Sequence, residues 1–269
     1  MAFLICSCAN EDVKTAETDN IKTYNVDSIR QVFNPVINGI WLAEEYYQAL
    51  EKTKSPYKAY EKAGIITGLL IEKQGGDSLS ISVNNSNHEG TSFIAWYRPG
   101  HTENALPLNL KGSDKITAFT ELGYEINEKD TFLFIYFYNN ANTIYDKIKF
   151  RKVSPTGPGK DLAFGVEYAV NNLVAGKYTY PDNMGQINRV EFTRDGKVSG
   201  FDYMTTYSLL ADFAMEEYKG DKIFFNSDIE PAIFGFELNN DTLNLYGLDL
   251  SEDGKWSRME LAHKLTPIN

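Results

Sequence analysis

Two stretches of this chain carry similar short landmarks in the same order, and this internal repeat constrains the fold more than any other feature. Near their starts, Gly39-Ile40-Trp41 corresponds to Gly176-Lys177-Tyr178. Three later landmarks of the first stretch are Asp114-Lys115-Ile116, Asp130-Thr131-Phe132 and Lys152-Val153-Ser154-Pro155. Their counterparts in the second are Asp221-Lys222-Ile223, Asp241-Thr242-Leu243 and Lys264-Leu265-Thr266-Pro267. Four landmarks in one order predict a tandem duplication of a single β-rich unit.

The repeat divides the 269 residues into two units of ordinary domain size, each long enough to bury its own core. We expect the first domain over residues 27–154 and the second over 161–269. The linker is residues 155–160, because the prolines and glycines of Ser154-Pro155-Thr156-Gly157-Pro158-Gly159 oppose a continuing strand.

Charge and residue counts exclude several classes of partner. The 26 Lys and Arg against 37 Asp and Glu give a net charge of −11, which argues against nucleic acid because phosphate binding needs clustered cations. His88, His101 and His263 are too few and too scattered to predict a metal site. No cofactor is therefore expected.

The N-terminus resembles the end of a bacterial lipoprotein signal peptide. Cys8 follows the small residue Ser7, and the aliphatic Ile5 stands three positions before it, although the apolar run is shorter than usual. The alternative is a cytosolic chain with a chance apolar start. In the first interpretation Cys8 is lipidated, and residues 1–26 are a truncated signal and a polar, flexible tether. The protein would then be an outer-membrane lipoprotein of the bacterial cell envelope, periplasmic or surface-exposed, held by its lipid alone.

Strands and tight turns dominate the rest of the chain. In the first repeat we predict strands over 64–73, 77–84, 91–98, 105–110, 114–122, 130–138 and 143–153. In the second we predict strands over 176–180, 186–194, 197–208, 221–226, 231–238, 241–248 and 255–265. Turn signals such as Asp195-Gly196 and Asn239-Asn240 join neighbouring strands into hairpins. A meander of about eight strands closes naturally into an antiparallel barrel, so the fold class is mostly β, with two tandem barrels.

Short helices precede each repeat. We predict one over residues 27–33, stopped by Asn34-Pro35, and one over 161–173. The first repeat also carries a helical insertion: a helix over 44–54, then a second that starts with Ser55 as cap and Pro56 in the first turn. The insertion either covers one end of the first barrel or packs against the second domain.

Gly39-x-Trp41 at the start of an eight-stranded meander resembles the lipocalin (calycin) pattern, and the match is closest to lipocalin-like domains of uncharacterised Bacteroidota lipoproteins. The resemblance implies that Trp41 plugs one barrel end beneath a basic residue of the last strand. Lys149, Arg151 and Lys152 are the candidates in the first repeat. The second repeat has Tyr178 in place of the tryptophan, with Arg258 or Lys264 as the base.

The run Thr131 to Tyr138 is apolar on both faces, so one face fills the barrel and something must cover the other. A barrel of eight strands is either packed solid or just wide enough for one small ligand. If it holds a ligand, we expect these residues to line the cavity or its mouth: Trp41, Tyr46, Trp96, Tyr136, Tyr203 and Tyr207. The alternative for each ring is core packing. Arg98, beside Trp96-Tyr97, either pairs with an anionic head group or forms a surface ion pair or a cation–π stack.

No catalytic pattern is evident. Neighbouring acids such as Glu44-Glu45 and Glu216-Glu217 do not face each other on a helix or strand, and no Gly-x-Ser-x-Gly motif occurs. Carboxylates from different strands could still meet in space. We therefore expect a non-enzymatic binding protein that holds a small apolar or amphipathic molecule, or a glycan, by its aromatic side chains. The alternative is an interaction or scaffold module that docks a protein partner at the cell envelope.

Overall fold

The computed structural model describes residues 24–111, 116–157, 160–182, 184–216, 218–226, 231–252 and 254–268. Strands make up 48% and helices 16%, which confirms the mostly-β expectation. The expected lipidation site Cys8 lies outside the described residues, as does most of the expected tether. Within the described part of the chain, no helix combines the length and the apolar character that crossing a membrane requires.

The first lobe is a closed antiparallel barrel of eight strands in sequence order. Its strands are β1 (Gly39–Ala43), β2 (Gly68–Ile71), β3 (Ser78–Asn85), β4 (Glu89–Trp96), β5 (Ala105–Leu108), β6 (Phe119–Ile126), β7 (Thr131–Tyr138) and β8 (Ile144–Ser154). Pairing of β1 with β8 closes it. The strand expected over 114–122 begins later, at Phe119. One expected barrel is thereby confirmed.

The second lobe is an eight-stranded antiparallel sheet that does not close. Its strands are β9 (Gly176–Pro181), β10 (Ile187–Phe192), β11 (Val198–Ser199), β12 (Thr206–Leu209), β13 (Lys222–Asn226), β14 (Ala232–Asn239), β15 (Thr242–Leu250) and β16 (Trp256–Pro267). The order is β11-β10-β9-β16-β15-β14-β13-β12. As β1 does in the barrel, the opening strand β9 pairs with both the next strand and the last one.

The gap between β11 and β12 explains why a second closed barrel is not confirmed. The single strand expected over 197–208 was wrong, because the chain turns between β11 and β12. Gly200 has a φ of +77°, and a Cβ there would lie 2.1 Å from the Arg189 carbonyl oxygen. The two strands that remain, β11 and β12, are short and form no ladder with each other. An isolated bridge links Lys197, just before β11, to Thr206 of β12.

In the part of the chain that the structure describes, four α-helices and one 3₁₀ turn accompany the strands. They are α1 (Val26–Ile37), α2 (Glu44–Thr53), α3 (Pro56–Ala59), η1 (Tyr60–Lys62) and α4 (Leu162–Asn171). The prediction that α1 stops at Asn34-Pro35 was wrong, since the helix continues to Ile37 with Pro35 inside it. Burial of Phe33 and Ile37, and the 2.6 Å bond that Tyr97 Oη donates to Asn34 Oδ1, hold this last turn on the barrel. Tertiary packing therefore outweighs the helix-breaking tendency of proline.

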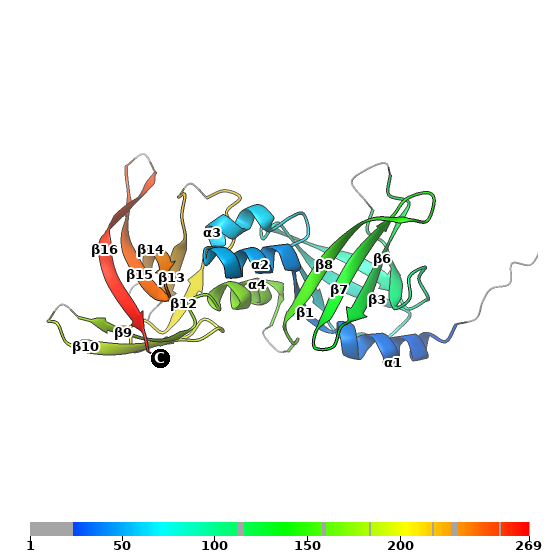
Figure 1. Ribbon diagram of the computed structural model, residues 1–269, viewed down its shortest axis with the longest axis horizontal. Coiled ribbons are helices and arrows are strands. Elements are labelled where there is room, and N and C mark those ends of the chain that lie inside the picture. The colour runs from blue at the N-terminus through cyan, green and yellow to red at the C-terminus, as the bar shows by residue number, and fades with distance from the viewer. Residues whose placement is uncertain are drawn as a thin grey trace, which may run out of the picture.

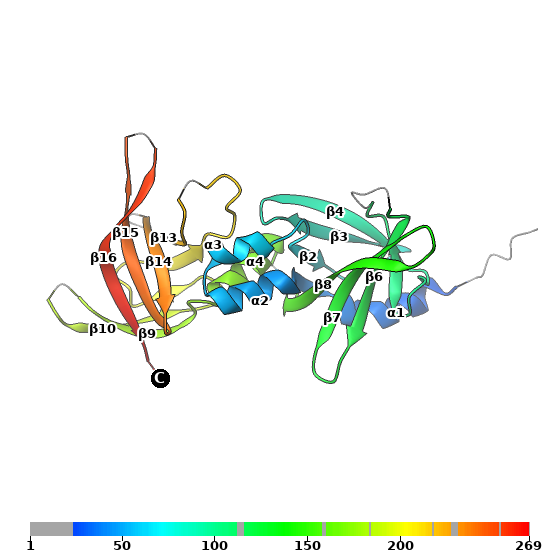
Figure 2. The ribbon, with the colours of Figure 1, turned by 45° about the horizontal axis from the view of Figure 1, so that its top comes forward.

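Helices α2, α3 and α4 lie between the two β-lobes, while α1 lies against the barrel at the N-terminal end (Figure 1, Figure 2). Helix α4 contacts strands β1, β2, β3 and β8 of the barrel and β12 of the second lobe. Gly165 makes this approach close, because a Cβ there would meet the Ile40 Cγ2 methyl at 2.1 Å. The helix that opens the second repeat thus also packs on the first barrel.

The helical insertion packs against the second lobe, as one of its two predicted roles expects, and α2 also contacts β1 and β8 of the barrel. Tyr57 donates its backbone N–H to Asp221 Oδ1 at 2.7 Å. The rings of Tyr57 and Tyr60 each meet the Phe213 ring edge-on at 5.4 Å. Ser55 caps α3 as expected, by accepting the Lys58 N–H at 3.1 Å. The insertion therefore joins the lobes.

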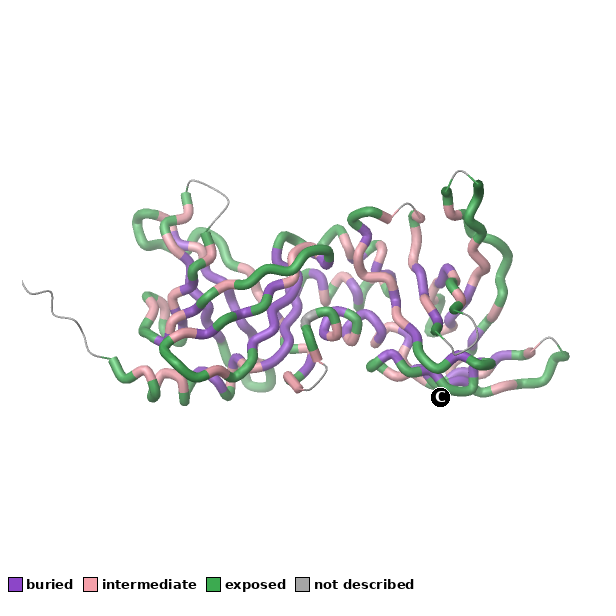
Figure 3. Tube along the Cα trace, turned by 180° about the vertical axis from the view of Figure 1, so that it is seen from behind, coloured by how far each residue is buried: buried purple, intermediate pink, exposed green. Residues whose placement is uncertain are grey.

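One apolar core runs through the barrel and into the second lobe (Figure 3). The barrel interior contributes large rings such as Trp41, Tyr97 and Phe150, each at most 1% exposed. In the second lobe Phe201 and Phe225 are equally buried. Exposed residues occur over both lobes and include the outer parts of the β9–β10 and β15–β16 hairpins (Figure 3). Side chains thus fill the interior of the barrel, in line with the packed alternative for eight strands.

Candidate binding face on the first barrel

The outer surface of β7 carries a row of aromatic rings separate from the main core. Phe132, Phe134, Tyr136 and Tyr138 form a second apolar cluster, with Phe119 of β6 beside it. The alternate residues Leu133 and Ile135 point into the barrel core. Alternation along β7 therefore puts four rings in line on the outside, each at most 6% exposed.

A row of cations on the neighbouring strand β8 covers these rings. The pairing sets Lys147, Lys149 and Arg151 opposite Tyr136, Phe134 and Phe132, respectively. Lys149 Nζ lies 3.6 Å from the Phe132 ring centre, and Lys147 Nζ lies 4.8 Å from that of Phe134. We call these four rings and three cations the β7–β8 face. Its apolar layer lies under aliphatic stems whose charged ends reach solvent.

Arg151 is the anchored member of the cation row. Its Nε and an Nη donate to the two carboxylate oxygens of Glu44 at 2.8 and 2.9 Å. The Arg151 hydrogen bonds hold the pKa of Glu44 below its ordinary value, against the effect of burial. The pair ties the start of α2 to β8, and it leaves Lys147 and Lys149 as the cations of the row without a carboxylate partner among the described ion pairs.

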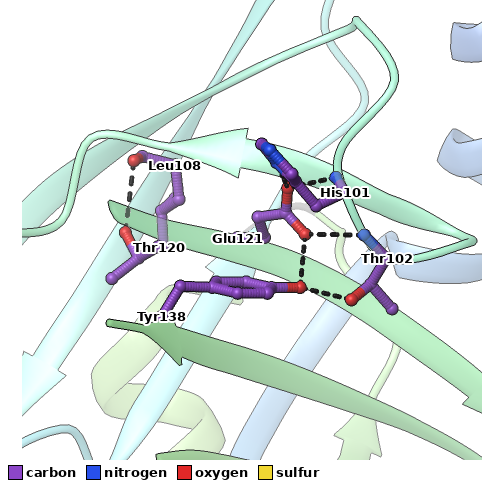
Figure 4. Close-up of polar contacts among 6 residues, drawn as sticks. All are labelled: His101, Thr102, Leu108, Thr120, Glu121 and Tyr138. Atoms are coloured by element: carbon purple, nitrogen blue, oxygen red, sulfur yellow. Dashed lines mark hydrogen bonds and ion pairs between the residues drawn. The ribbon is translucent and has the colours of Figure 1, made fainter. Parts of the chain in front are cut away.

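The far end of the aromatic row is fixed by a buried carboxylate. Glu121 of β6 is 1% exposed, and its two oxygens accept the backbone N–H groups of His101 and Thr102 at 2.5 and 3.1 Å. Tyr138 Oη donates to Glu121 Oε2 at 2.8 Å and also bonds the Thr102 hydroxyl (Figure 4). The loop before β5 is thereby held over Phe119, on which the His101 ring lies at 4.6 Å.

This cluster positions the loop rather than performing chemistry. The acceptor oxygens of Glu121 are occupied by three donors, so the carboxylate is fixed in place. Burial raises the pKa of Tyr138 to about 12, and it raises that of Tyr136, next to Glu125, still further. Both hydroxyls therefore stay protonated and serve as hydrogen-bond donors near neutral pH.

Two clefts adjoin the β7–β8 face. One, of about 460 Å³, lies between β8 and residues 62–66. Its wall includes Phe134, the cations Lys62, Lys147 and Lys149, and the acids Glu45, Glu125 and Asp146. The other, of about 370 Å³, lies between the ends of α1, β7 and β8 and includes Phe132 and Arg151. The first cleft lies where β1 has ended. β1 stops at Ala43, opposite Phe150 of β8, and the chain then leaves the barrel wall as α2, so the residues of β8 before Phe150 have no β1 residue beside them. Both volumes fall in the ~300–1,000 Å³ range of small-molecule sites.

The Gly-x-Trp corner lies at the adjoining barrel end. Trp41 is fully buried and donates its Nε1–H to the Ile37 carbonyl at 2.8 Å. Lys152 is the basic residue that covers it, with Nζ 4.9 Å from the ring centre. Gly39 has a φ of +145° and leaves room for the Lys152 side chain. A Cβ at position 39 would lie only 2.5 Å from Lys152 Cε.

The second lobe contains one similar hydrogen bond. Tyr178 Oη donates to the Val174 carbonyl at 3.0 Å, four residues earlier, as Trp41 does to Ile37. Among the cation–π pairs of the described residues, none joins Arg258 or Lys264 to Tyr178. Arg258 instead stacks on Tyr246 and pairs with Glu237 on the outside of the sheet.

The expected ligand-binding residues do not converge on one cavity. Tyr136 belongs to the β7–β8 face, whereas Trp41 lies inside the barrel. Trp96 is half-buried with Arg98 stacked over it at 5.3 Å, the stacking alternative named above. Tyr46 is buried in α2, and burial raises its pKa far above the ordinary range.

In the second lobe, Tyr207 is buried and donates to the Thr193 carbonyl at 2.8 Å, whereas Tyr203 is 48% exposed at the turn before β12. Sequence reasoning missed Lys147, and it named Lys149 only as a candidate to cover Trp41. The signal was present, because lysines alternate along β8 just as rings alternate along β7, but the two runs had to be paired to show it.

Across the residues that the structure describes, no group of three His, Cys, Asp or Glu side chains is placed to hold a metal ion. What the β7–β8 face offers is noncovalent: ring surface, ammonium groups and tyrosine hydroxyls. No protein-family model matches the chain. No curated protein matches it either.

Proposed function

We propose that this chain is a non-enzymatic binding protein that holds an amphipathic molecule or oligosaccharide bearing negative charge on the β7–β8 face. The observation that carries the proposal is the row of rings on β7 with the lysines of β8 above it, next to clefts of ligand size. The proposal keeps the ligand class expected from the aromatic sequence. It assigns the ligand to the outer surface of the barrel, because buried side chains occupy the interior.

Negative charge on the ligand follows from the cations. Lys147 is exposed and Lys149 half-buried, so an anionic group pairs with them at little desolvation cost. When the lysines swing toward such a group, the Phe132 and Phe134 rings below become available to sugar C–H groups or an apolar chain. The rest of the protein is acidic, which repels the same ligand elsewhere and favours this surface.

Replacing both lysines, Lys147→Ala with Lys149→Ala, should weaken binding of acidic oligosaccharides about twofold to thirtyfold, because two ion pairs of about 0.2–1 kcal/mol each are lost. The measurement is titration calorimetry with a panel of uronic-acid oligosaccharides and their neutral counterparts. The matched control replaces the exposed lysines Lys52 and Lys73 with alanine, which keeps the net charge of the double variant and should leave affinity unchanged.

Equal loss in both double variants would show that net charge alone, not this face, governs binding. Absence of any binding would instead favour the protein-docking alternative, whose specific support is the β15–β16 hairpin with exposed Leu250, Met259 and Leu261.

We propose also that the chain is a lipoprotein of the bacterial cell envelope, anchored through Cys8. The support is the Ile5-Cys6-Ser7-Cys8 sequence and the polar stretch that follows it. A Cys8→Ser variant expressed in its own host should move from the membrane fraction to the soluble fraction and lose the mass of the acyl groups. Cys6→Ser is the control, and unchanged fractionation of the Cys8 variant would reject the anchor.

We infer that the two lobes arose by duplication of one lipocalin-like unit. Support comes from the shared strand order, with the opening strand between the second and the last, and from the matching hydrogen bonds of Trp41 and Tyr178. The open edge between β11 and β12 is where the second unit departs from the first.

A further inference from the structure

Strand β8 has one edge that is only partly paired. Strand β1 covers this edge from Phe150 to Ser154 and stops at Ala43, where the chain turns into α2, between the two lobes (Figure 1). Strand β7 occupies the other edge of β8 along most of its length. Within the described chain, the segment 144–149 therefore has a neighbouring strand on one side alone, and a free edge of this kind can pair with an added strand.

One hydrogen bond shows which backbone groups face the free edge. The N–H of Lys147 donates to Asp146 Oδ1 at 2.8 Å, so it does not donate to β7. Backbone groups along a strand point alternately to its two sides, so Lys149 presents its N–H and carbonyl to the same edge as Lys147. Outside the ladder with β7, no backbone hydrogen bond of the described chain ends on either lysine.

The cleft of about 460 Å³ lies along this edge. Its far wall is the segment 62–66, which leads into β2 and contributes the buried Ala63 and Ile66. The half-buried Ile148 of β8, which packs on the barrel core, lies on the near wall. Strand β1 pairs with β2 on one side and with β8 on the other, so a continuation of β1 past Ala43 would occupy this space. The cleft is therefore placed to accept one more extended segment.

The two faces of such a segment would meet different chemistry. On the outward face, Lys147 and Lys149 lie over the rings of β7 without a carboxylate partner among the described ion pairs. Two acids of the wall are already held, Glu125 by a tyrosine hydroxyl of β7 at 3.2 Å and Asp146 by the Lys147 N–H. The remaining charges of the wall are exposed and of opposite sign: Glu45 and Lys62. An added strand thus meets unpaired positive charge outward and aliphatic side chains inward.

We propose that the free edge of β8 and its cleft bind a short extended peptide as an added antiparallel strand, with acidic side chains outward on Lys147 and Lys149 and aliphatic side chains inward on Ile148 and Ile66. The direction is that of β1, which the peptide would prolong. A second copy of this chain does not fit, because two β8 edges paired antiparallel set lysine opposite lysine. The inference goes beyond the ligand proposed for the β7–β8 face, since it rests on the backbone edge and not on access to the rings.

The test is titration calorimetry of the full chain with the peptide acetyl-Val-Glu-Val-Glu-Val-amide. In an antiparallel pair, the peptide residue opposite a lysine shares its outward face and turns its own N–H toward β8. N-methylation of both glutamates removes these donors and should weaken binding about fivefold to a hundredfold. N-methylation of two valines, whose N–H groups face away from β8, is the matched control and should change affinity little. The basic peptide acetyl-Val-Lys-Val-Lys-Val-amide should bind about fivefold more weakly or worse.

Two variants at one position separate the backbone from the side chain. Lys149→Ala and Lys149→Pro both remove the ammonium group, but only proline removes the N–H at the free edge, where proline is tolerated in strands. The proline variant should bind the acidic peptide about threefold to tenfold more weakly than the alanine variant. If the proline variant unfolds, the methylated peptides decide alone.

Valine methylation that weakens binding as much as glutamate methylation would overturn the proposal, as would equal affinity for the acidic and basic peptides. Absence of peptide binding would overturn it too, and binding of uronic-acid oligosaccharides in the same experiment would leave the function proposed for the β7–β8 face in place. Phase-dependent peptide binding without sugar binding would support the strand addition and reject that function.

Discussion

Replacing Trp41 with alanine should lower the free energy of unfolding by about 3–5 kcal/mol, which is the usual cost of removing a fully buried aromatic ring. The ring is 0% exposed, donates to the Ile37 carbonyl and lies under Lys152, so no neighbouring side chain can fill the space without moving a helix end or a strand. For a chain of this size the melting temperature should fall by about 10 °C. Thermal and urea unfolding, followed by circular dichroism, measure both quantities.

Two other tryptophan variants test the cause. Trp41→Phe keeps most of the ring but loses the hydrogen bond, and should cost about 1–2 kcal/mol. Trp96→Ala removes a half-buried ring stacked with Arg98 and should cost less than Trp41→Ala. If the two alanine variants proved equally unstable, the plug role of Trp41 would be refuted.

Asp221→Asn should stabilise the protein at neutral pH by about 2–3 kcal/mol and have little effect near pH 4. Burial at the junction with α3 raises the pKa of Asp221 to about 6 from its ordinary 3.8, despite the Ser55 hydroxyl and the Tyr57 N–H. Between these values the folded chain holds a proton that the unfolded chain releases, so stability falls as pH rises from about 4 to 6. Above pH 6 the charged carboxylate is present in both states, and its desolvation penalty applies in full.

Urea unfolding of the wild type and Asp221→Asn at pH 4.5, 6 and 7.5 measures this difference. An asparagine oxygen still accepts the Tyr57 N–H, so the variant removes the charge and keeps the contact. The exposed Asp249→Asn is the control and should leave the curve unchanged. A stability gain that is the same at all three pH values would show that the buried charge is not its source.

Much of the local structure was predictable because it depends on neighbouring residues. The Ser55 cap with Pro56 behind it started α3 as expected, and alternation over 131–138 correctly assigned which residues share a face. Both signals act within a few residues, through hydrogen bonds to the backbone and through the two-residue period of a strand.

Predictions failed where contacts between distant segments determine the local structure. Pro35 suggested the end of a helix, but contacts of Phe33 and Ile37 with the barrel carry α1 beyond it. The apolar run over 197–208 suggested one strand, but Gly200 fits tightly against the Arg189 carbonyl and splits it. The candidate residues were chosen for their rings alone, and the covering lysines come from another strand.

The sequence by itself determined that the chain is mostly β and that rings alternate along β7, since both follow from local periodicity and turn chemistry. The tertiary structure alone decided that the first sheet closes and the second stays open, and that the lysines of β8 lie over the rings of β7. It also decided that the insertion, α4 and the β3–β4 turn join the lobes. These features depend on strand pairing and on contacts between residues more than a hundred positions apart, such as Asn87 with Ala211, which no local pattern encodes.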